Sequence, residues 1–264
     1  MISFLKVRLR VKGIHNVRYI FLVIFVILSS CERHQLKTVT YTSGDFPQEV
    51  YVWQRVWTKE LIDAVETKAV EFDKSILLGA EINYSKGEWS CQHFSAPLRW
   101  AEQNPGEYGL AFRINSKAAF TKWAEGDCEK VINYIRPYVS SAKVIQIDYD
   151  CPSLKLTDYS RLLKRLKHEF PNTSLEITCL PDWLNFPEFS DLVQLTDRYI
   201  MQVHGVSGHG KGMALCNTDE AYRVATKCAE HDIPFLMALP TYRHAVSYGS
   251  DGKIRQVASE GNYQ

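Results

Sequence analysis

The fold of this chain is decided by one segment, Val144-Ile145-Gln146-Ile147-Asp148-Tyr149-Asp150-Cys151-Pro152. Its β-branched residues predict a strand over Val144–Asp150, and Pro152 marks the end of that strand. Asp148 and Asp150 are two positions apart, so their carboxylates should point to the same side of the strand. Two carboxylates on one side of a strand end predict a polar site there.

Six further segments have the same character, because each is rich in β-branched or aromatic residues and is bounded by polar residues, Gly or Pro. They are Glu49–Trp57, Ile76–Asn83, Tyr108–Asn115, Leu175–Leu180, Tyr199–His204 and Phe235–Leu239. Helical patterns lie between several of them, at Lys59–Phe72, Ser116–Val139, Asp158–Phe170 and Glu220–Glu230.

Strand starts recur every 24 to 36 residues. Repeated βα units predict a parallel sheet, and seven of them in a row predict an α/β fold of the TIM-type (β/α)8 barrel over residues 49–264. A doubly wound open sheet is the alternative. No Gly-rich phosphate loop follows the first strand, so a nucleotide-binding domain is not supported.

The eighth strand is missing from this pattern. The tail Ser247–Gln264 contains Gly249, Asp251-Gly252 and Gly261 and is predicted to be irregular and poorly packed, as a loop or hairpin. We therefore expect a barrel with a gap between Glu49–Trp57 and Phe235–Leu239, and we interpret the gap as a C-terminal truncation.

The carboxyl ends of barrel strands are where active sites are built. In this chain these ends carry carboxylates, amides and large aromatic side chains, a mixture that binds sugars by ring stacking and by hydrogen bonds to hydroxyl groups. The predicted substrate-binding residues are Arg55, Trp57, Arg113, Tyr149, Trp183, Gln202, His204 and Tyr242.

Asp148 and Asp150 are the principal catalytic candidates. Two carboxylates held close together raise the pKa of one of them, and glycoside hydrolysis uses two carboxyl groups in this way. In this hypothesis Asp150 is the proton donor, Asp148 adjusts its pKa, and Glu81 or Asp182 supplies a second carboxylate. The alternative is structural: Asp148 accepts a hydrogen bond and Asp150 caps the following loop.

The remaining candidates also have structural alternatives. Glu81 is expected to form a buried ion pair with Arg113 rather than to act on a substrate. His204 is a base, a substrate donor or a buried inner histidine. Trp57 and Trp183 are either stacking platforms for sugar rings or packing residues.

The N-terminus has the pattern of a secretory signal. Five basic residues and no acidic residue occur in residues 1–18, and ten apolar residues follow at Tyr19–Leu28. The apolar run is about half the length that a spanning helix needs. Leu28-Ser29-Ser30-Cys31 resembles a lipobox, which predicts a signal peptide over residues 1–30, lipidation of Cys31 and a polar tether over residues 31–48. The alternative is a buried N-terminal helix with an unrelated cysteine.

Lipidation would attach the protein to a membrane through its acyl chains. Glu32 follows the cysteine at the position where an inner-membrane retention signal usually has Asp. The sequence therefore predicts a bacterial cell-envelope location, with the outer membrane favoured.

Charge and cysteine content limit the partners. The chain has 31 Lys and Arg against 30 Asp and Glu, and without the five basic residues of the signal it has 26 against 30, a net charge of −4. An acidic mature chain does not suit nucleic acid. No Cys or His spacing indicates zinc, and no motif indicates a cofactor. Cys151 and Cys179 should lie at the ends of successive strands, where they either form a disulfide or pack as small buried hydrophobes.

Four segments together resemble the bacterial domain-of-unknown-function family 3142. They are Tyr51–Trp57, Gln146–Pro152, Leu180–Leu184 and Gln202–His204, and the resemblance extends from about residue 49 to the end. It implies a barrel related to glycoside hydrolases and carries no established activity.

The Val144–Asp150 strand is also similar to the strand of family-18 chitinases that ends in Asp-x-Asp-x-Glu, where the Glu is the acid. The matching positions here are Gln146, Asp148 and Asp150, so only the middle acid is the same. The comparison implies that this strand end is a catalytic position.

Three functions follow from these expectations. The first is an envelope enzyme, similar to glycoside hydrolases, that acts on a glycan or polysaccharide. The second is a carbohydrate-binding or scaffold lipoprotein without turnover, because no hydrolase motif is intact. The third, a peptide or envelope-assembly partner, would require a large apolar patch at the rim.

Overall fold

The computed structural model describes residues 47–68, 71–103, 108–115, 123–205, 214–241 and 244–259. Cys31 and Tyr242, the predicted lipidation and substrate-binding residues, lie outside these ranges, as do the predicted signal segment and the first part of the predicted helix Ser116–Val139.

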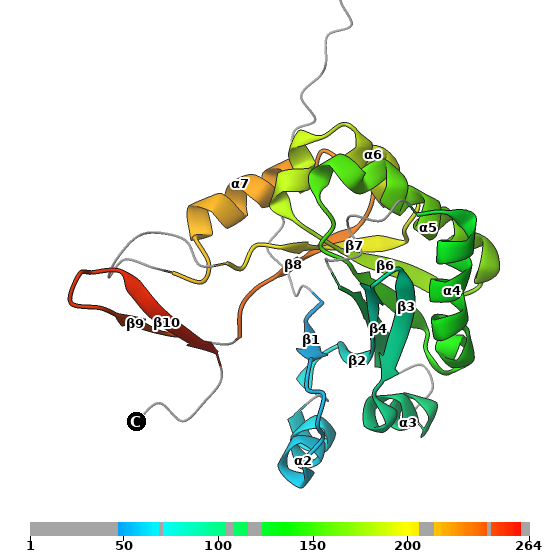
Figure 1. The fold of residues 1–264 in the computed structure, drawn as a ribbon, viewed down its shortest axis with the longest axis horizontal. Helices are drawn as coiled ribbons and strands as arrows, with labels where there is room; N and C mark the ends of the chain where they lie inside the picture. Colours follow the sequence, from blue (N-terminus) through cyan, green and yellow to red (C-terminus); the bar gives the residue numbers. More distant parts are fainter. Residues whose placement is uncertain are drawn as a thin grey trace, which may run out of the picture. The chain divides into compact units, whose positions relative to one another are not determined.

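Seven of the described strands form one parallel sheet (Figure 1). In spatial order they are β1 (Glu49–Val52), β2 (Lys74–Ser85), β4 (Tyr108–Ile114), β5 (Val144–Asp148), β6 (Ser174–Cys179), β7 (Arg198–Gln202) and β8 (Phe235–Ala238). Spatial order follows chain order, which is the topology of a (β/α) barrel and not of a doubly wound sheet, where the order reverses. All seven predicted strands are present, although β1 ends at Val52 and not at Trp57.

One strand was not expected. β3 (Glu88–His93) pairs antiparallel with the end of β2 through a two-residue turn at Lys86 and Gly87. Both turn residues have positive φ, 53° and 86°, which is the requirement of the hairpin turn whose twist matches its strands. This hairpin extends the sheet beyond the carboxyl end of β2.

Helices connect the parallel strands. They are α2 (Lys59–Lys68), α3 (Ser95–Gln103), α4 (Glu125–Ile135), α5 (Leu156–Glu169), α6 (Glu188–Val193) and α7 (Thr218–Cys228). The predicted helices correspond to α2, α4, α5 and α7, whereas α3 and α6 were not predicted. Asn217 caps α7 by accepting a hydrogen bond from the Glu220 amide, at 3.0 Å. Within the described ranges, no helix combines the length and apolarity needed to cross a membrane.

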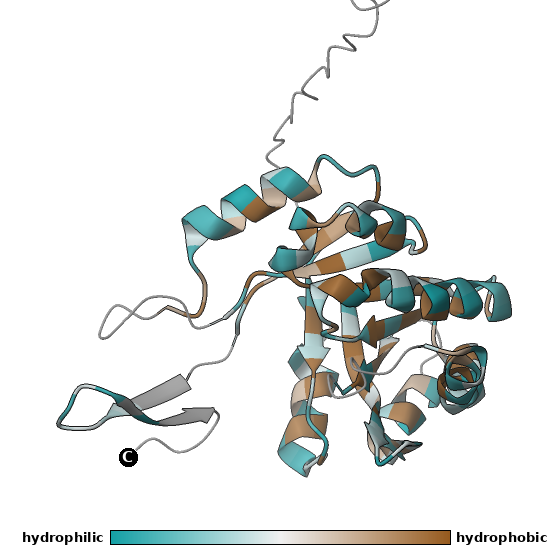
Figure 2. Ribbon diagram, turned by 45° about the horizontal axis from the view of Figure 1, so that its top comes forward, coloured by the Kyte–Doolittle hydropathy of each residue, from teal (hydrophilic) through white to brown (hydrophobic). Residues whose placement is uncertain are grey.

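The outward face of the sheet and the helices form the main core. Along α5 and α7 hydrophobic residues alternate with hydrophilic ones (Figure 2), as in helices that bury one face. Tyr149 and Tyr159 are fully buried with their rings edge to face, 5.1 Å between centroids, and Trp123 meets Tyr149 in the same way at 5.7 Å. Ile147 and Ile177 complete the sheet side of this core.

The inward face carries a polar network near the amino ends of the strands. Arg198 donates to both carboxylate oxygens of Glu49, at 2.8 and 2.9 Å, and to Glu176 at 2.7 Å. Lys74 lies 3.3 Å from Glu49 and 3.7 Å from Glu176, and Gln146 donates to Glu176 at 3.1 Å. Since β1 and β7 are far apart in the sheet order, the bond between Glu49 and Arg198 spans the concave side of the curved sheet.

The barrel is open. β1 and β8 are the two ends of the parallel sheet, and no described strand pairs between them, so the expected gap is confirmed. Of the two predicted forms of the tail, a loop or a hairpin, the structure has the hairpin, with paired strands in place of the irregular chain that was expected. β9 (His244–Tyr248) and β10 (Ile254–Ser259) form an antiparallel hairpin, drawn in red in Figure 1, that is a separate two-stranded sheet. The Asp251-Gly252 turn signal, with Gly252 at φ 73°, closes this hairpin.

Candidate functional site

A row of charged side chains crosses the carboxyl ends of β2, β4 and β5. It consists of Glu81, Arg113 and Asp148, and we call it the rim row. Glu81 is the register neighbour of Arg113, and Arg113 is the register neighbour of Asp148. Residues that are neighbours in register point to the same side of a sheet. Thr178 of β6 continues the row, because its hydroxyl donates to Asp148 Oδ1 at 2.7 Å.

Asp148 is the buried member of this row. Its side chain is 9 % exposed, and Arg113 Nε lies 3.6 Å from its Oδ2. Burial raises the pKa of Asp148, and the charge of Asp150 raises it further, while Thr178 and Arg113 oppose the shift. Asp148 can therefore hold a proton at a pH where an ordinary aspartate is ionised.

Asp150 is the more accessible member of the pair. It lies two residues past the end of β5 and is half-buried. Gln202 Nε2 of β7 donates to its Oδ1 at 3.2 Å, which ties the Asp150 carboxylate to the carboxyl end of β7. His204 lies close enough to Asp150 for the carboxylate charge to raise the pKa of the histidine, although burial lowers that pKa by more. The structure therefore brings Asp148, Asp150, Gln202 and His204 together.

Glu81 has a different partner from the one expected. Arg55, which lies beyond the end of β1, donates to Glu81 Oε1 through both Nε, at 3.1 Å, and a terminal nitrogen. The predicted ion pair between Glu81 and Arg113 is wrong, because Arg113 turns toward Asp148 instead. Glu81 remains in the rim row but is neutralised by Arg55.

Two aromatic residues predicted to bind substrate are in the core. Tyr149 is 0 % exposed, since the alternation that points Asp148 inward points Tyr149 toward the helices. Trp183 is 1 % exposed in a short 3₁₀ helix, Pro181–Asn185, and its Nε1 donates to the carbonyl of Cys151 at 3.2 Å. Neither side chain can stack on a substrate in this position.

Trp57 and Asp182 also lie apart from the rim row. Trp57 packs against Trp100 of α3, with 5.9 Å between ring centroids, which fits the packing alternative. Asp182 is exposed and lines a hollow that includes Glu220 and Arg223 of α7, on the helix side of the sheet. Its position there does not suit a second catalytic carboxylate.

An aromatic residue at the mouth was missed. Trp53 stacks on Tyr51, with centroids 5.4 Å apart and planes within 2°. Tyr51 faces the interior, on the same side of β1 as Glu49, and burial and the charges of Glu176, Glu49 and Asp148 raise its pKa. Trp53 is two positions nearer the carboxyl end of the strand and only partly buried, so it is the better platform for a sugar ring. The alternation of Tyr51 and Trp53 was the available signal.

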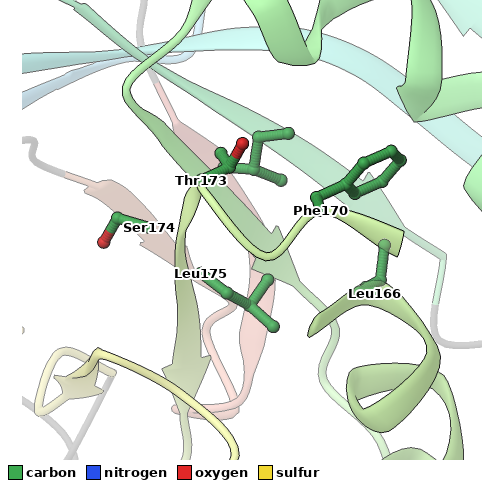
Figure 3. Close-up of a pocket in the computed structure, with 6 residues that line it drawn as sticks. Leu166, Phe170, Thr173, Ser174 and Leu175 are labelled. Atoms are coloured by element: carbon green, nitrogen blue, oxygen red, sulfur yellow. The ribbon is translucent and has the colours of Figure 1, made fainter. Parts of the chain in front are cut away.

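A small hollow lies away from the row of charged side chains. A hollow of about 10 Å³ lies between α5, β5 and β6, lined by Leu166, Phe170, Thr173 and Leu175 among others (Figure 3). It has room for about one water molecule and lies at the amino ends of the strands, away from Asp148. Among the described residues there is no group of three or more His, Cys, Asp or Glu side chains suited to a metal ion. The six cysteines from Cys91 to Cys228 are free thiols, and Cys151 and Cys179 are buried.

The fold and the rim together define a class: an open TIM-type barrel with a carboxylate pair, Asp148 and Asp150, at the carboxyl end of β5. Residues 124–264 match the family described as Domain of unknown function (DUF3142), and the chain belongs to that family. No curated protein sequence gives a significant match.

Two solved structures have a similar fold. The spore cortex-lytic enzyme SleL of Bacillus cereus has a TM-score of 0.61 at 13 % identity, covering 81 % of this chain and 55 % of SleL. YKL-39, solved in the presence of chitooligosaccharides (GlcNAc4), has a TM-score of 0.54 at 12 % identity, covering 77 % of this chain and 69 % of YKL-39. The chain thus spans little more than half the length of SleL, and the likeness establishes the shared barrel fold.

Proposed function

We propose that this protein binds a glycan at the carboxyl-terminal rim of the barrel and hydrolyses its glycosidic bonds, with Asp150 as the proton donor. The observation that carries the proposal is the asymmetric pair at the carboxyl end of β5, in which Asp148 is buried with a raised pKa and Asp150 is more accessible. The fold supports the proposal, since SleL is a cortex-lytic enzyme and YKL-39 was solved with chitooligosaccharides.

In this proposal Asp150, the more accessible carboxyl group, delivers the proton to the substrate, and Asp148 is the buried carboxyl group of the pair, with a raised pKa. As the bond between the anomeric carbon and the glycosidic oxygen breaks, Asp150 transfers the proton to that oxygen, which leaves as a hydroxyl group. Water then adds to the anomeric carbon and returns a proton to the pair.

Three neighbours would position the sugar. Gln202 orients Asp150 through its hydrogen bond, and His204 beside it can donate to or accept from a hydroxyl group. Trp53 provides a flat apolar face for the CH side of a sugar ring. Each residue comes from a different strand end than Asp148, as is usual for barrel enzymes.

The second candidate is glycan binding without turnover. It is favoured by one observation: Glu81, the remaining carboxylate of the row, is tied to Arg55. With Asp182 on the helix side, hydrolysis would depend on Asp148 and Asp150 alone. A degenerate barrel that keeps only its binding residues would have this arrangement.

Replacement of Asp150 by asparagine separates these functions. Wild-type protein should release reducing ends from a chitooligosaccharide or from peptidoglycan, while Asp150→Asn should bind the same glycan without release. The matched control is Asp63→Asn, an exposed aspartate on α2, which should keep full turnover. Full turnover in Asp150→Asn would refute the catalytic role, and binding without release in the wild type would favour the second candidate.

We also propose that the protein acts in the bacterial cell envelope, anchored by a lipid on Cys31 and facing the periplasm from the outer membrane. The support is the sequence alone: a basic start, a short apolar run, the lipobox-like Leu28–Cys31, and Glu32 after the cysteine. Envelope glycans would then be the substrates within reach.

A further inference from the structure

Two arginines, Arg113 of the rim row and Arg55 beside it, are more exposed than the carboxylates with which they pair. The side chain of Arg55 is 55 % exposed and that of Arg113 is 48 % exposed, whereas their partners Glu81 and Asp148 are 19 % and 9 % exposed. A ligand that approaches the row therefore meets guanidinium groups before it meets these two carboxylates.

Neither guanidinium is fully used by its partner. Arg113 Nε is 3.6 Å from Asp148 Oδ2, which is too long for a hydrogen bond, and Asp148 Oδ1 is already occupied by Thr178. Arg55 directs two nitrogens to one oxygen of Glu81. Guanidinium groups bind anions best through two parallel hydrogen bonds, so both arginines keep nitrogens for a further acceptor.

The two arginines are also close to each other in the row. Arg55 pairs with Glu81, and Glu81 is the register neighbour of Arg113, so the two arginines are associated with adjacent strand ends. A neutral glycan would gain little from them, because its hydroxyl groups can be bound without two cations. An anionic group would gain charge-assisted hydrogen bonds from both.

We propose that the rim selects a carboxylate-bearing glycan, with Arg113 binding the sugar carboxylate and Arg55 beside it. This inference rests on the proposed glycan-binding function and names its substrate class. A singly charged carboxylate suits the rim better than a doubly charged phosphate, because Glu81, Asp148 and Asp150 already place three carboxyl groups there.

The test compares one glycan in two forms. The probe is a soluble tetrasaccharide of alternating N-acetylglucosamine and N-acetylmuramic acid, and its control is the same molecule with the carboxylates reduced to alcohols. Wild-type protein should bind the acidic form about tenfold more tightly, the size of one charge-assisted hydrogen bond. Arg113→Gln should lose this preference but bind the reduced form as before, and Arg113→Lys should keep part of it.

A matched control and folding measurements make the result decisive. Arg161→Gln changes an exposed arginine on α5 and should leave the preference unchanged. Thermal unfolding of Arg113→Gln and of Arg113→Lys shows whether a loss of preference comes from misfolding. Equal binding of both forms by wild type, or an unchanged preference in a folded Arg113→Gln, would overturn the inference and leave the proposed function standing. No binding of either form would overturn both.

Discussion

Replacing Arg198 by methionine tests the ion network inside the open barrel. Arg198 is 18 % exposed and bonds to Glu49 and Glu176, which are 7 % and 2 % exposed. Removing one partner of a buried ion pair costs about 3 to 5 kcal/mol, because a buried charge is left uncompensated. Lys74 remains within 3.3 Å of Glu49 and 3.7 Å of Glu176, so we expect the lower value, about 3 kcal/mol.

The loss should depend on pH. Burial raises the pKa of Glu176, and Arg198 is the largest opposing influence. A carboxyl group with a raised folded-state pKa contributes stability that is full below its unfolded pKa and is lost as the pH rises through the folded pKa. Without Arg198 the pKa of Glu176 rises further, so this loss becomes larger at the same high pH. The variant should therefore be less destabilised at about pH 5 than at about pH 8.

Urea unfolding at both pH values measures this effect. In a thermal scan at neutral pH, the same loss of about 3 kcal/mol should lower the melting temperature of the variant by roughly 6 to 12 °C in a domain of this size. The matched control is Arg161→Met, since Arg161 is 60 % exposed and lies 3.7 Å from Asp158. It should cost about 0.5 kcal/mol or less. Equal losses in both variants, or a loss at Arg198 that does not change with pH, would refute the reasoning.

Three shorter predictions concern residues singled out in the sequence. Trp183→Ala should lower the free energy of unfolding by about 3 to 5 kcal/mol in urea unfolding, because the ring is 1 % exposed. A folded variant with a large loss of glycan affinity would contradict the place of Trp183 in the core. Asp182→Asn should keep glycan turnover within about twofold, since the residue is exposed beside α7, and a complete loss of reducing-end release would reverse this assignment. Cys31→Ala should leave unprocessed precursor or soluble protein, as followed by membrane fractionation and mass spectrometry, and a wild-type Cys31 without lipid would end the anchoring proposal.

The location of the site could be predicted from the sequence, but the ion pairs that its residues form could not. Asp148 and Asp150 follow a strand with a strong pattern, so their place at a strand end depended only on local sequence. The partner of Glu81 could not be found in this way. Register alone favours Arg113, and Arg55 reaches Glu81 only because the chain turns after β1 ends at Val52.

The side of the sheet that a side chain faces could be predicted from strand alternation for some site residues and not for others. The alternation that placed Asp148 and Asp150 on one side also places Tyr149 on the other, so its burial follows from the same argument. Trp183 is different, because a 3₁₀ helix after β6 turns its ring toward the carbonyl of Cys151. The geometry of that short helix is not encoded in any simple period.

The rim row depends on an irregularity in β2. Lys74 faces the interior, where it meets Glu49 and Glu176, and strict alternation would then place Ala80 inward and Glu81 outward. The pairing of β2 with β4 shifts between Leu78 and Ala80, at Gly79. After this shift Ala80 lies in the outer core, and Glu81 is aligned with Arg113.

A single extra residue in a strand reverses the direction of every side chain that follows it, and such bulges often direct a side chain into a functional site. Glycine suits this position, because a Cβ on Gly79 would lie 3.2 Å from Leu98 Cδ2 and 3.6 Å from the Ala111 carbonyl oxygen. Without the bulge, Glu81 would point away from Asp148 and would not be aligned with Arg113. The bulge at Gly79 therefore sets the side of the sheet on which Glu81 joins Arg113 and Asp148.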